Sequence, residues 1–466
     1  MLPSDVGSLR EGLGKTSHCE SRFLADRQTR IALSDLVRGS RLRDPLSMFS
    51  GHSVLVATRD QLAGALTLIE LDGVVRRLTL CPPDLPHEYL PSVIGNAGID
   101  AIVCDHDSTE YGNLGIRLHF TCTKATGPAI ESRLSRYVTE WVLLTSGTSG
   151  LPKMALHSLG SLTTAINTSK TSQGSVVWGT FYDVRRYGGL QVFFRALLAG
   201  GSFVLSNVGE SLSQYLNRLG EDRVTHVLGT PSHWRRALMS PSALKITPEY
   251  IRLSGEIADQ SILDSLRAFY PHASISHAFA STEAGVAFEV TDGFEGFPAD
   301  IVGRSTGDVV LKMEGGSLRV RSPGTAKGYV GQNATILADD EGFVDTGDMV
   351  ERRGDRYYFL GRRGGIINVG GLKVHPEEVE AVINRHPAVR MSSVRARRNP
   401  ITGSIIVADV VLKVGPDSSN ASFQTRLKKE LLQVCREALS PHKVPASIRL
   451  VADLDVGAAG KLARHA

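Results

Sequence analysis

One stretch of the chain has the residue types and spacing of a phosphate-binding loop. Four apolar residues, Trp141–Leu144, predict a short buried strand, and Lys153 stands shortly beyond it. Glycines in the connecting loop allow turns that expose backbone N–H groups, and hydroxyl groups beside them add donors for an anion. The residues that we expect in this loop are Thr145, Ser146, Gly147, Thr148, Ser149, Gly150 and Lys153.

The main alternative for such a loop is a solvated linker, since Ser/Gly-rich runs are typical of linkers. A buried strand before the loop and a Pro-Lys pair after it favour phosphate binding. The loop is not a Walker A motif, because Pro152 rather than Gly precedes Lys153.

The segment Thr145–Lys153 resembles the phosphate-loop signature of the adenylate-forming enzymes. That superfamily includes acyl- and aryl-CoA ligases, adenylation domains of peptide synthetases, and firefly luciferase. The resemblance implies that the chain uses ATP and Mg²⁺ to activate a carboxylic acid as acyl-AMP.

The segment His277–Glu283 resembles the aromatic-Gly-x-Thr-Glu motif of the same superfamily, with Ala280 in the glycine position. Phe279 would offer a flat face to adenine, and Thr282 a hydroxyl near the α-phosphate. Glu283 would supply a carboxylate for Mg²⁺. Taken alone, the segment is equally consistent with a strand end that carries a solvent-facing acid.

A Thr-Gly-Asp sequence ending at Asp348 matches a third superfamily motif. A carboxylate held at a glycine turn can accept hydrogen bonds from both ribose hydroxyl groups. Arg362 resembles the superfamily arginine that also reaches the ribose. Each match is weak by itself, because Gly-Asp turns and surface arginines are common.

Two further motifs lie near the C-terminus. The resemblance implies that Gly370 and Gly371 line a tunnel for a pantetheine arm, although a bulge before a helix that starts with proline explains them equally well. Lys461 stands in the position of the lysine that bridges the carboxylate and the α-phosphate, where an ammonium group would stabilise the charge of the transition state.

The five motifs occur in the superfamily's order over about residues 50 to 464, but three further positions depart from the pattern. Gly364 stands at the hinge position, which usually holds Asp or Lys. Arg186 falls where many acyl-CoA ligases carry His, and Asp455 replaces a proline. These departures concern the thiol acceptor and the acyl pocket more than adenylation.

Composition leaves an enzyme of this kind open and argues against several other classes. The formal net charge of +4 arises from scattered basic residues, so nothing indicates a nucleic-acid surface. Five well-separated cysteines form neither a metal motif nor a disulfide framework. We expect no transmembrane segment and no signal peptide, and therefore a cytoplasmic protein.

The chain should be an α/β protein with a large N-terminal domain of sheets packed with helices, followed by a β-rich subdomain. Apolar runs alternate with helical patterns from Ser53 onwards, whereas residues 1–50 show only weak helical patterning. Alternating strands and Gly-rich turns begin near residue 300. We expect an ATP- and acid-binding domain over residues 1–361 and a small, mobile α+β domain over residues 362–466, which carries the lysine.

The expected function is an acid–thiol ligase whose thiol is most simply that of CoA. A free-standing ligase that loads the phosphopantetheine of a carrier protein is the alternative, and a non-catalytic nucleotide-binding homologue is a third possibility. The aromatic rings of Tyr187 and Trp234 hint at a bounded pocket for a small or aromatic acid.

Overall fold

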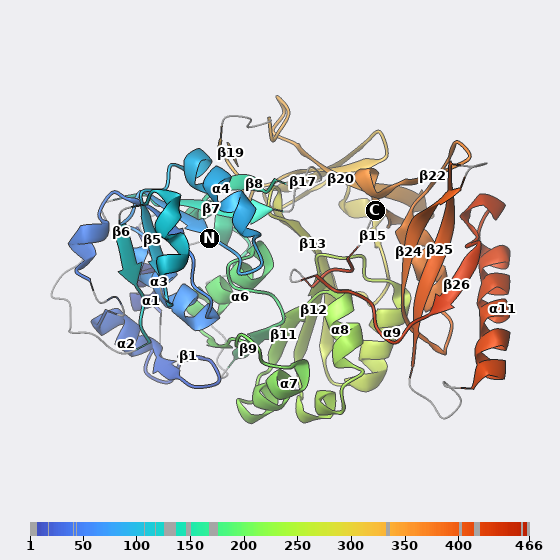
Figure 1. The fold of residues 1–466 in the computed structure, drawn as a ribbon, viewed down its shortest axis with the longest axis horizontal. Coiled ribbons are helices and arrows are strands. Elements are labelled where there is room, and N and C mark those ends of the chain that lie inside the picture. The colour runs from blue at the N-terminus through green and yellow to red at the C-terminus, as the bar shows by residue number, and fades with distance from the viewer. Residues whose placement is uncertain are drawn as a thin grey trace.

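The chain forms a large N-terminal domain and a smaller C-terminal domain, which lies at the right of Figure 1 in orange and red. The computed structural model describes residues 7–16, 18–40, 42, 44–106, 108–116, 118–124, 137–145, 151–166, 176–331, 336–399, 403–413, 420–457 and 460–463. Within these ranges, no helix is both long enough and apolar enough to cross a membrane.

A seven-stranded sheet, in the order β19-β8-β7-β4-β3-β5-β6, carries the predicted phosphate-binding segment. Its central strands are parallel and buried on both faces, which explains why their sequences are continuous apolar runs. The strands are β3 (Ser53–Val56), β4 (Arg77–Leu80), β5 (Ala101–Cys104), β6 (Leu118–Thr121), β7 (Glu140–Thr145), β8 (Lys153–Ser158) and β19 (Gly328–Tyr329).

A second, eight-stranded sheet has the order β14-β13-β12-β11-β9-β10-β1-β2. Its two N-terminal strands come from the first 50 residues, where the sequence showed only weak helical patterning, and β1 runs parallel to β10. The strands are β1 (Phe23–Ala25), β2 (Arg30–Ala32), β9 (Val177–Thr180), β10 (Ser202–Val204), β11 (His226–Gly229), β12 (Tyr250–Ser254), β13 (Ser274–Ser281) and β14 (Gly285–Val290).

Helices pack on both sheets and join their cores. The rings of Trp141 and Phe194 meet edge to face at 5.6 Å, so α6 connects the first sheet to a core that also includes Leu228 of the second. The helices of this domain are α1 (Leu9–Gly14), α2 (Leu33–Arg38), α3 (Gln61–Leu71), α4 (Leu90–Ala97), α5 (Leu159–Thr163), α6 (Tyr187–Leu198), α7 (Leu212–Glu221), α8 (Pro231–Ala237) and α9 (Gln260–Phe269).

The β-rich subdomain is an antiparallel sheet in the order β15-β21-β20-β18-β17-β16, as the alternating sequence after residue 300 predicts. Its longest strands, β20 and β21, hold the third motif. The strands are β15 (Phe297–Pro298), β16 (Ser305–Thr306), β17 (Val309–Glu314), β18 (Ser317–Arg321), β20 (Val344–Arg353) and β21 (Arg356–Arg362).

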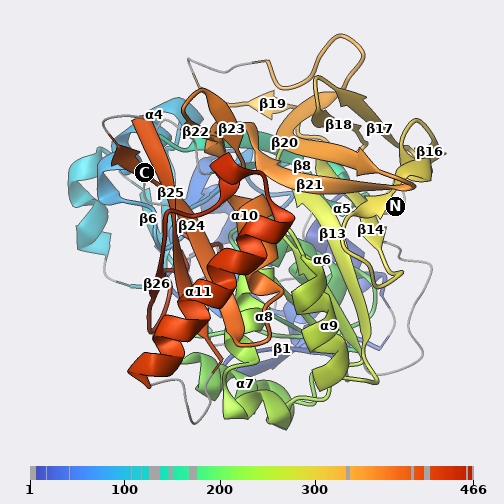
Figure 2. The same ribbon diagram turned by 90° about the vertical axis from the view of Figure 1, so that its right-hand side faces the viewer.

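A single 3-10 turn, Arg363–Gly365, connects β21 to the C-terminal domain. Figure 2 shows α10 and α11 lying on one face of a three-stranded sheet there, around a core of Val379, Ile383, Leu427 and Leu431. The elements are β22 (Ile367–Val369), β23 (Leu372–Val374), α10 (Pro376–Asn384), β24 (Val389–Asn399), β25 (Gly403–Leu412), α11 (Ala421–Ala438) and β26 (Ser447–Leu450).

Buried polar contacts dock the C-terminal domain onto α8 and α9. Arg235 pairs with both oxygens of Asp259 at 2.6 Å, and both residues belong to the large domain. Asn384 donates to Asp259 over 3.2 Å, and Arg235 donates to the carbonyl oxygen of Arg390 over 3.1 Å. The smaller domain therefore binds a charge pair that is already complete, which avoids leaving a buried charge unpaired.

Candidate active site

The predicted phosphate loop is the connection of a β-hairpin. β7 and β8 are antiparallel, and Thr145 lies opposite Lys153 at the end of the ladder next to the loop. The strand before the loop is buried as predicted, with Trp141 and Val142 both at 0% exposure. The predicted residues Ser146, Gly147, Thr148, Ser149 and Gly150 lie outside the described part of the chain.

The predicted metal ligand Glu283 lies beside this hairpin. Tyr329, on β19, donates its hydroxyl hydrogen to Glu283 Oε1 over 3.4 Å. The ammonium group of Lys153 lies 5.2 Å from the centre of the Tyr329 ring, within cation–π range. Three side chains from distant parts of the sequence are thus brought together, with the cation over the ring of Tyr329 and the carboxylate at its hydroxyl group.

Thr282 is held through its backbone. His157, a fully buried residue of β8, contacts the Thr282 carbonyl oxygen through Nε2 over 2.7 Å. Burial lowers the pKa of His157 to about 4, so the ring is neutral at ordinary pH and donates the hydrogen of Nε2. One strand therefore supplies Lys153 and also supports the residue next to Glu283.

Phe279 lies on β13 and joins an aromatic cluster of the β-rich subdomain. Its ring is near parallel to that of Phe359, at 5.3 Å and 11°, and to that of Phe288, at 5.8 Å and 17°. The side chain is half-buried. An adenine ring would therefore meet the part of Phe279 that its two aromatic neighbours leave accessible.

Asp348 and Arg362 form the predicted ribose pair at facing positions of β20 and β21. Arg362 Nε donates to Asp348 Oδ1 over 3.2 Å. Burial raises the pKa of Asp348, and the nearby Arg362 opposes this shift. The carboxylate is thus positioned and largely desolvated, as a binding group for two hydroxyl groups should be.

Lys461 comes from the C-terminal domain and reaches the same place. Its carbon Cε would lie 3.5 Å from a methyl group added to Gly255, so its side chain runs across the loop after β12. The side chain remains open to solvent, yet surrounding protein withdraws enough water that burial lowers its pKa, and Arg362 adds to this effect. The carboxylates of Glu256, Asp348 and Glu283 oppose the shift.

Gly370 and Gly371 lie elsewhere, at the exposed turn between β22 and β23. Their φ values of 57° and 86° suit a tight hairpin turn, which requires glycine or asparagine. A methyl group on either glycine would meet nothing within 4 Å. In this arrangement the turn alone explains both glycines, and their predicted role in a pantetheine tunnel stays a prediction.

The side chains present suit a magnesium ion that is bound together with a triphosphate. No group of three His, Cys, Asp or Glu side chains in the described ranges could hold a metal by itself. Mg²⁺ is usually held by one or two carboxylates together with substrate phosphates and water, which matches the single carboxylate of Glu283. The metal would neutralise phosphate charge.

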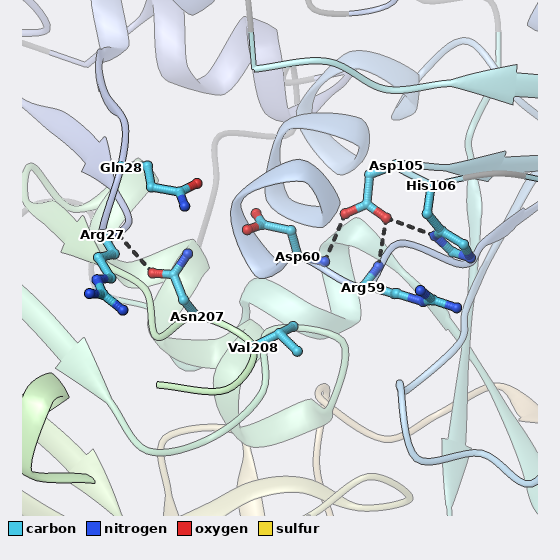
Figure 3. Close-up of a pocket in the computed structure, with 8 residues that line it drawn as sticks. All are labelled: Arg27, Gln28, Arg59, Asp60, Asp105, His106, Asn207 and Val208. Carbon is cyan, nitrogen blue, oxygen red and sulfur yellow. Dashed lines mark hydrogen bonds and ion pairs between the residues drawn. The ribbon is translucent and has the colours of Figure 1, made fainter. Parts of the chain in front are cut away.

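A separate polar pocket of about 310 Å³ lies beside the N-terminus of α3, and none of the residues above lines it. Figure 3 shows Asp105 joined by dashed lines to its neighbours Arg59, Asp60 and His106. Asp105 accepts hydrogen bonds from the backbone N–H groups of Arg59 and Asp60, both over 2.8 Å. We assign the chemistry to the site around Lys461 and not to this pocket.

Some contacts of the site could not be read from motifs. Arg186, which replaces the usual histidine, pairs with Asp84. Glu256 contacts the segment that carries Lys461, and Tyr329 contacts Glu283. In the sequence, Tyr329 and Glu256 simply follow glycines, and neither dipeptide is a motif. Their contacts join residues that are far apart in the sequence, so no local pattern predicts them.

Known proteins resemble this chain in sequence and in fold. Residues 122–330 match the family model described as AMP-binding enzyme, and residues 378–461 match the AMP-binding enzyme C-terminal domain. Among curated relatives, a 2-succinylbenzoate–CoA ligase of Bacillus velezensis is 26% identical over 439 residues, which cover 90% of this chain and 82% of that protein.

Solved structures share the fold over nearly the whole chain. The o-succinylbenzoate CoA synthetase of Bacillus subtilis, in complex with its acyl-adenylate intermediate, has a TM-score of 0.71 at 18% identity, over 97% of this chain and 96% of that one. The amide bond synthetase McbA of Marinactinospora thermotolerans has a TM-score of 0.77 at 17% identity, over 97% and 98%.

The fold and the site define an adenylate-forming ligase with a large and a small domain. The chain belongs to the AMP-binding enzyme family, whose two models together match more than half of it. It activates a carboxylic acid with ATP to an acyl adenylate and then passes the acyl group to a thiol.

Proposed function

We propose that this chain is an AMP-forming acid–CoA ligase in which Lys461 serves the adenylation step. The observation that carries the proposal is the position of Lys461. This residue of the small domain lies among the charged groups Asp348, Arg362 and Glu283 of the predicted nucleotide site.

The residues have separate tasks in this scheme. A carboxylate oxygen of the acid attacks the α-phosphorus of ATP, and pyrophosphate leaves. The ammonium group of Lys461 stabilises the negative charge that grows on the α-phosphate in that step. Asp348 and Arg362 hold the ribose, and Lys153 holds phosphate oxygens. A thiolate then attacks the acyl carbon, and AMP leaves.

CoA is the acceptor that we favour, since the named ligases among the relatives use it. A carrier-protein phosphopantetheine presents the same thiol and remains the alternative. The likeness to an amide bond synthetase adds amines to the panel that should be tested. A cytoplasmic location, where CoA is available, is part of the same proposal.

We further propose that the acid carries a second anionic group, as 2-succinylbenzoate does. Arg252 is 5% exposed on β12, three residues and therefore about 10 Å of strand before Gly255. Its only salt bridge among the described residues is a 3.7 Å contact with Glu289. Arg195 Nε, on α6, is buried without a hydrogen-bond partner in the described ranges.

The charge balance of this cluster supports a second anion. Burial, followed by the neighbouring Arg252, lowers the pKa of Arg195 to about 10. Two guanidinium groups share one carboxylate, that of Glu289. Excess positive charge in a largely desolvated place is costly, and a carboxylate on the substrate would reduce that cost.

An exchange assay tests the proposed function. Incorporation of labelled pyrophosphate into ATP should depend on the acid, across a panel of aromatic and aliphatic monoacids and diacids. Acceptors are then compared with the best acid, using CoA, a phosphopantetheinylated carrier protein and simple amines. A protein that binds ATP but supports no exchange with any acid would favour the non-catalytic alternative.

A further inference from the structure

The segment that carries Lys461 is held against the large domain at three points. The hydroxyl group of Thr230 donates to the carbonyl oxygen of Gly460. The backbone N–H of Leu462 donates to Glu256 Oε1 over 2.9 Å. Gly460 packs against the ring of His233. The contacts fall on both residues that flank Lys461, so they fix the backbone from which its side chain extends.

The segment is shaped to make these contacts. Val456 and Leu462 form an antiparallel bridge, and Gly457 N–H donates to the Lys461 carbonyl oxygen over 2.8 Å. The chain therefore folds back on itself before it meets the large domain. Figure 1 shows this red segment running from β26 back over α8.

Glu256 is a preorganised acceptor on the large domain. Its second oxygen accepts a hydrogen bond from the backbone N–H of Ser232 over 2.9 Å. The Ser232 hydroxyl group donates to its first oxygen over 3.0 Å. Both contacts lie within the large domain, so the carboxylate keeps its direction whether or not Leu462 is bound to it.

The contact of Gly460 with His233 leaves no room for a side chain. A methyl group on Gly460 would lie 1.8 Å from Cε1 of the His233 ring. The ring is itself fixed, because its Nδ1 accepts from the Thr230 backbone N–H over 3.2 Å. Burial, followed by the neighbouring Arg236, lowers the pKa of His233 to about 4, so the ring is neutral near pH 7.

We propose that Thr230, His233 and Glu256 form a docking site for residues 460–462, and that docking positions Lys461 for acyl-AMP formation. The proposal rests on the proposed function for the role of Lys461. Glu256 is a positioning residue in this scheme, since it acts through the backbone of Leu462. A mobile tail would lose conformational entropy each time it brought Lys461 into place. Docking the segment beforehand removes this cost from the reaction step.

A first experiment needs no acid substrate. Trypsin cleavage after Lys461, followed by mass spectrometry in the presence of MgATP, reports how often the segment leaves its docking site. Glu256→Ala should speed this cleavage by about tenfold or more, because a hydrogen bond to a charged acceptor is lost. Glu249→Ala, at the opposite end of β12 and exposed, is the matched control and should leave the rate unchanged.

A second pair of variants tests the contact with His233. Gly460→Ala should expose Lys461 to trypsin through the clash with the ring. Adding His233→Ala should restore part of the protection, because it creates the missing space. Recovery will be partial, since the φ of 71° at position 460 disfavours alanine. Thermal unfolding of each variant verifies that the fold is intact.

Wild-type protection in Glu256→Ala, or no recovery in the double variant, would overturn the proposal. Activity distinguishes it from the proposed function. With an acid identified by the exchange assay, Glu256→Ala should slow acyl-AMP formation about tenfold to a hundredfold, while transfer from supplied acyl-AMP to CoA is kept. If no acid supports exchange in the wild type, the proposed function fails, and the cleavage experiments still decide whether the segment docks.

Discussion

Asp348 and Arg362 face each other across β20 and β21 and are joined by a hydrogen bond of 3.2 Å. Their strands are neighbours in a sheet, so the pair is set by backbone register before any nucleotide arrives. Asp348 is positioned by a partner that is 60% exposed and therefore free to adjust to a ligand. The proposed ribose site is thus partly built into the fold.

Removing this carboxylate should weaken nucleotide binding without changing the preferred acid. Asp348→Ala deletes the acceptor for the ribose hydroxyl groups and should cost about 1–3 kcal/mol of ATP binding free energy. Phe279→Ala should have an effect of similar size through the lost stacking surface. Calorimetric titration with ATP measures both. A changed acid preference at unchanged ATP affinity would mean that the nucleotide and acid sites are interchanged.

Lys461 should matter for one half-reaction only. Lys461→Ala removes the ammonium group that we propose to face the α-phosphate, and it should slow acyl-AMP formation by roughly 10²-fold or more. Thioester formation from supplied acyl-AMP should remain close to the wild-type rate. Single-turnover measurements of the two steps provide the comparison, and equal losses in both would contradict the assigned role.

Arg252 and Arg195 should select the acid. Arg252→Met or Arg195→Met should raise KM for a diacid by about tenfold to a hundredfold, because a charge-assisted hydrogen bond is lost. Activity with the matching monoacid should be retained or improved. Arg267→Met, at an exposed site on α9, serves as the control. A diacid that is used equally well by all three variants would show that its second anion binds elsewhere.

His157 should make the fold sensitive to acid. The pKa of this residue is lowered to about 4 in the folded protein, against an ordinary value of 6.5. Protonation of His157 therefore favours the unfolded chain. The folded state keeps its full stability above pH 6.5 and loses part of it as the pH falls towards 4. The linkage relation gives a loss of about 2 kcal/mol of unfolding free energy by pH 5. Urea unfolding at pH 7 and pH 5 measures it.

The matched variants for this test are His157→Gln and His272→Gln. The first should reduce the difference between the two pH values, because glutamine does not titrate. The second changes an exposed histidine and should leave the wild-type difference in place. An unaltered difference in His157→Gln would assign the acid sensitivity to other groups.

Gly364 should tolerate alanine better than proline. Its φ is not positive here, so alanine fits the observed backbone. Proline would fix φ near −65° and also restrict Arg363 before it. We expect Gly364→Pro to keep acyl-AMP formation and lose thioester formation, as measured by exchange and by single-turnover transfer. Wild-type rates in both steps would place the hinge elsewhere.

The sequence predicted the large elements well because their signals are local. The buried strand before Lys153, the antiparallel texture after residue 300 and the helix that begins at Pro376 all follow from periodicity and capping residues. The strand β1 was missed, since three residues that pair with β10, far along the chain, carry no periodic signal.

Site residues could be predicted from the sequence only where they stand in a recognisable motif. Lys153, Glu283, Asp348, Arg362 and Lys461 were found by their motifs, and the structure brings each of them to one region. Tyr329 and Glu256 act on residues 46 and 206 positions away in the sequence. Their importance depends on tertiary contacts, which composition and spacing do not encode.

The place where the two domains join has a thermodynamic consequence. Arg362 is the last residue of β21, and the turn that leads into the C-terminal domain begins at the next residue. The predicted nucleotide contact and the covalent link between the domains are therefore one peptide bond apart. We expect nucleotide binding at Arg362 to be coupled to the orientation of the small domain, and reciprocity then requires the orientation to change nucleotide affinity by the same factor. On this proposal, exchange of ATP for AMP and the orientation of Lys461 belong to one coupled equilibrium.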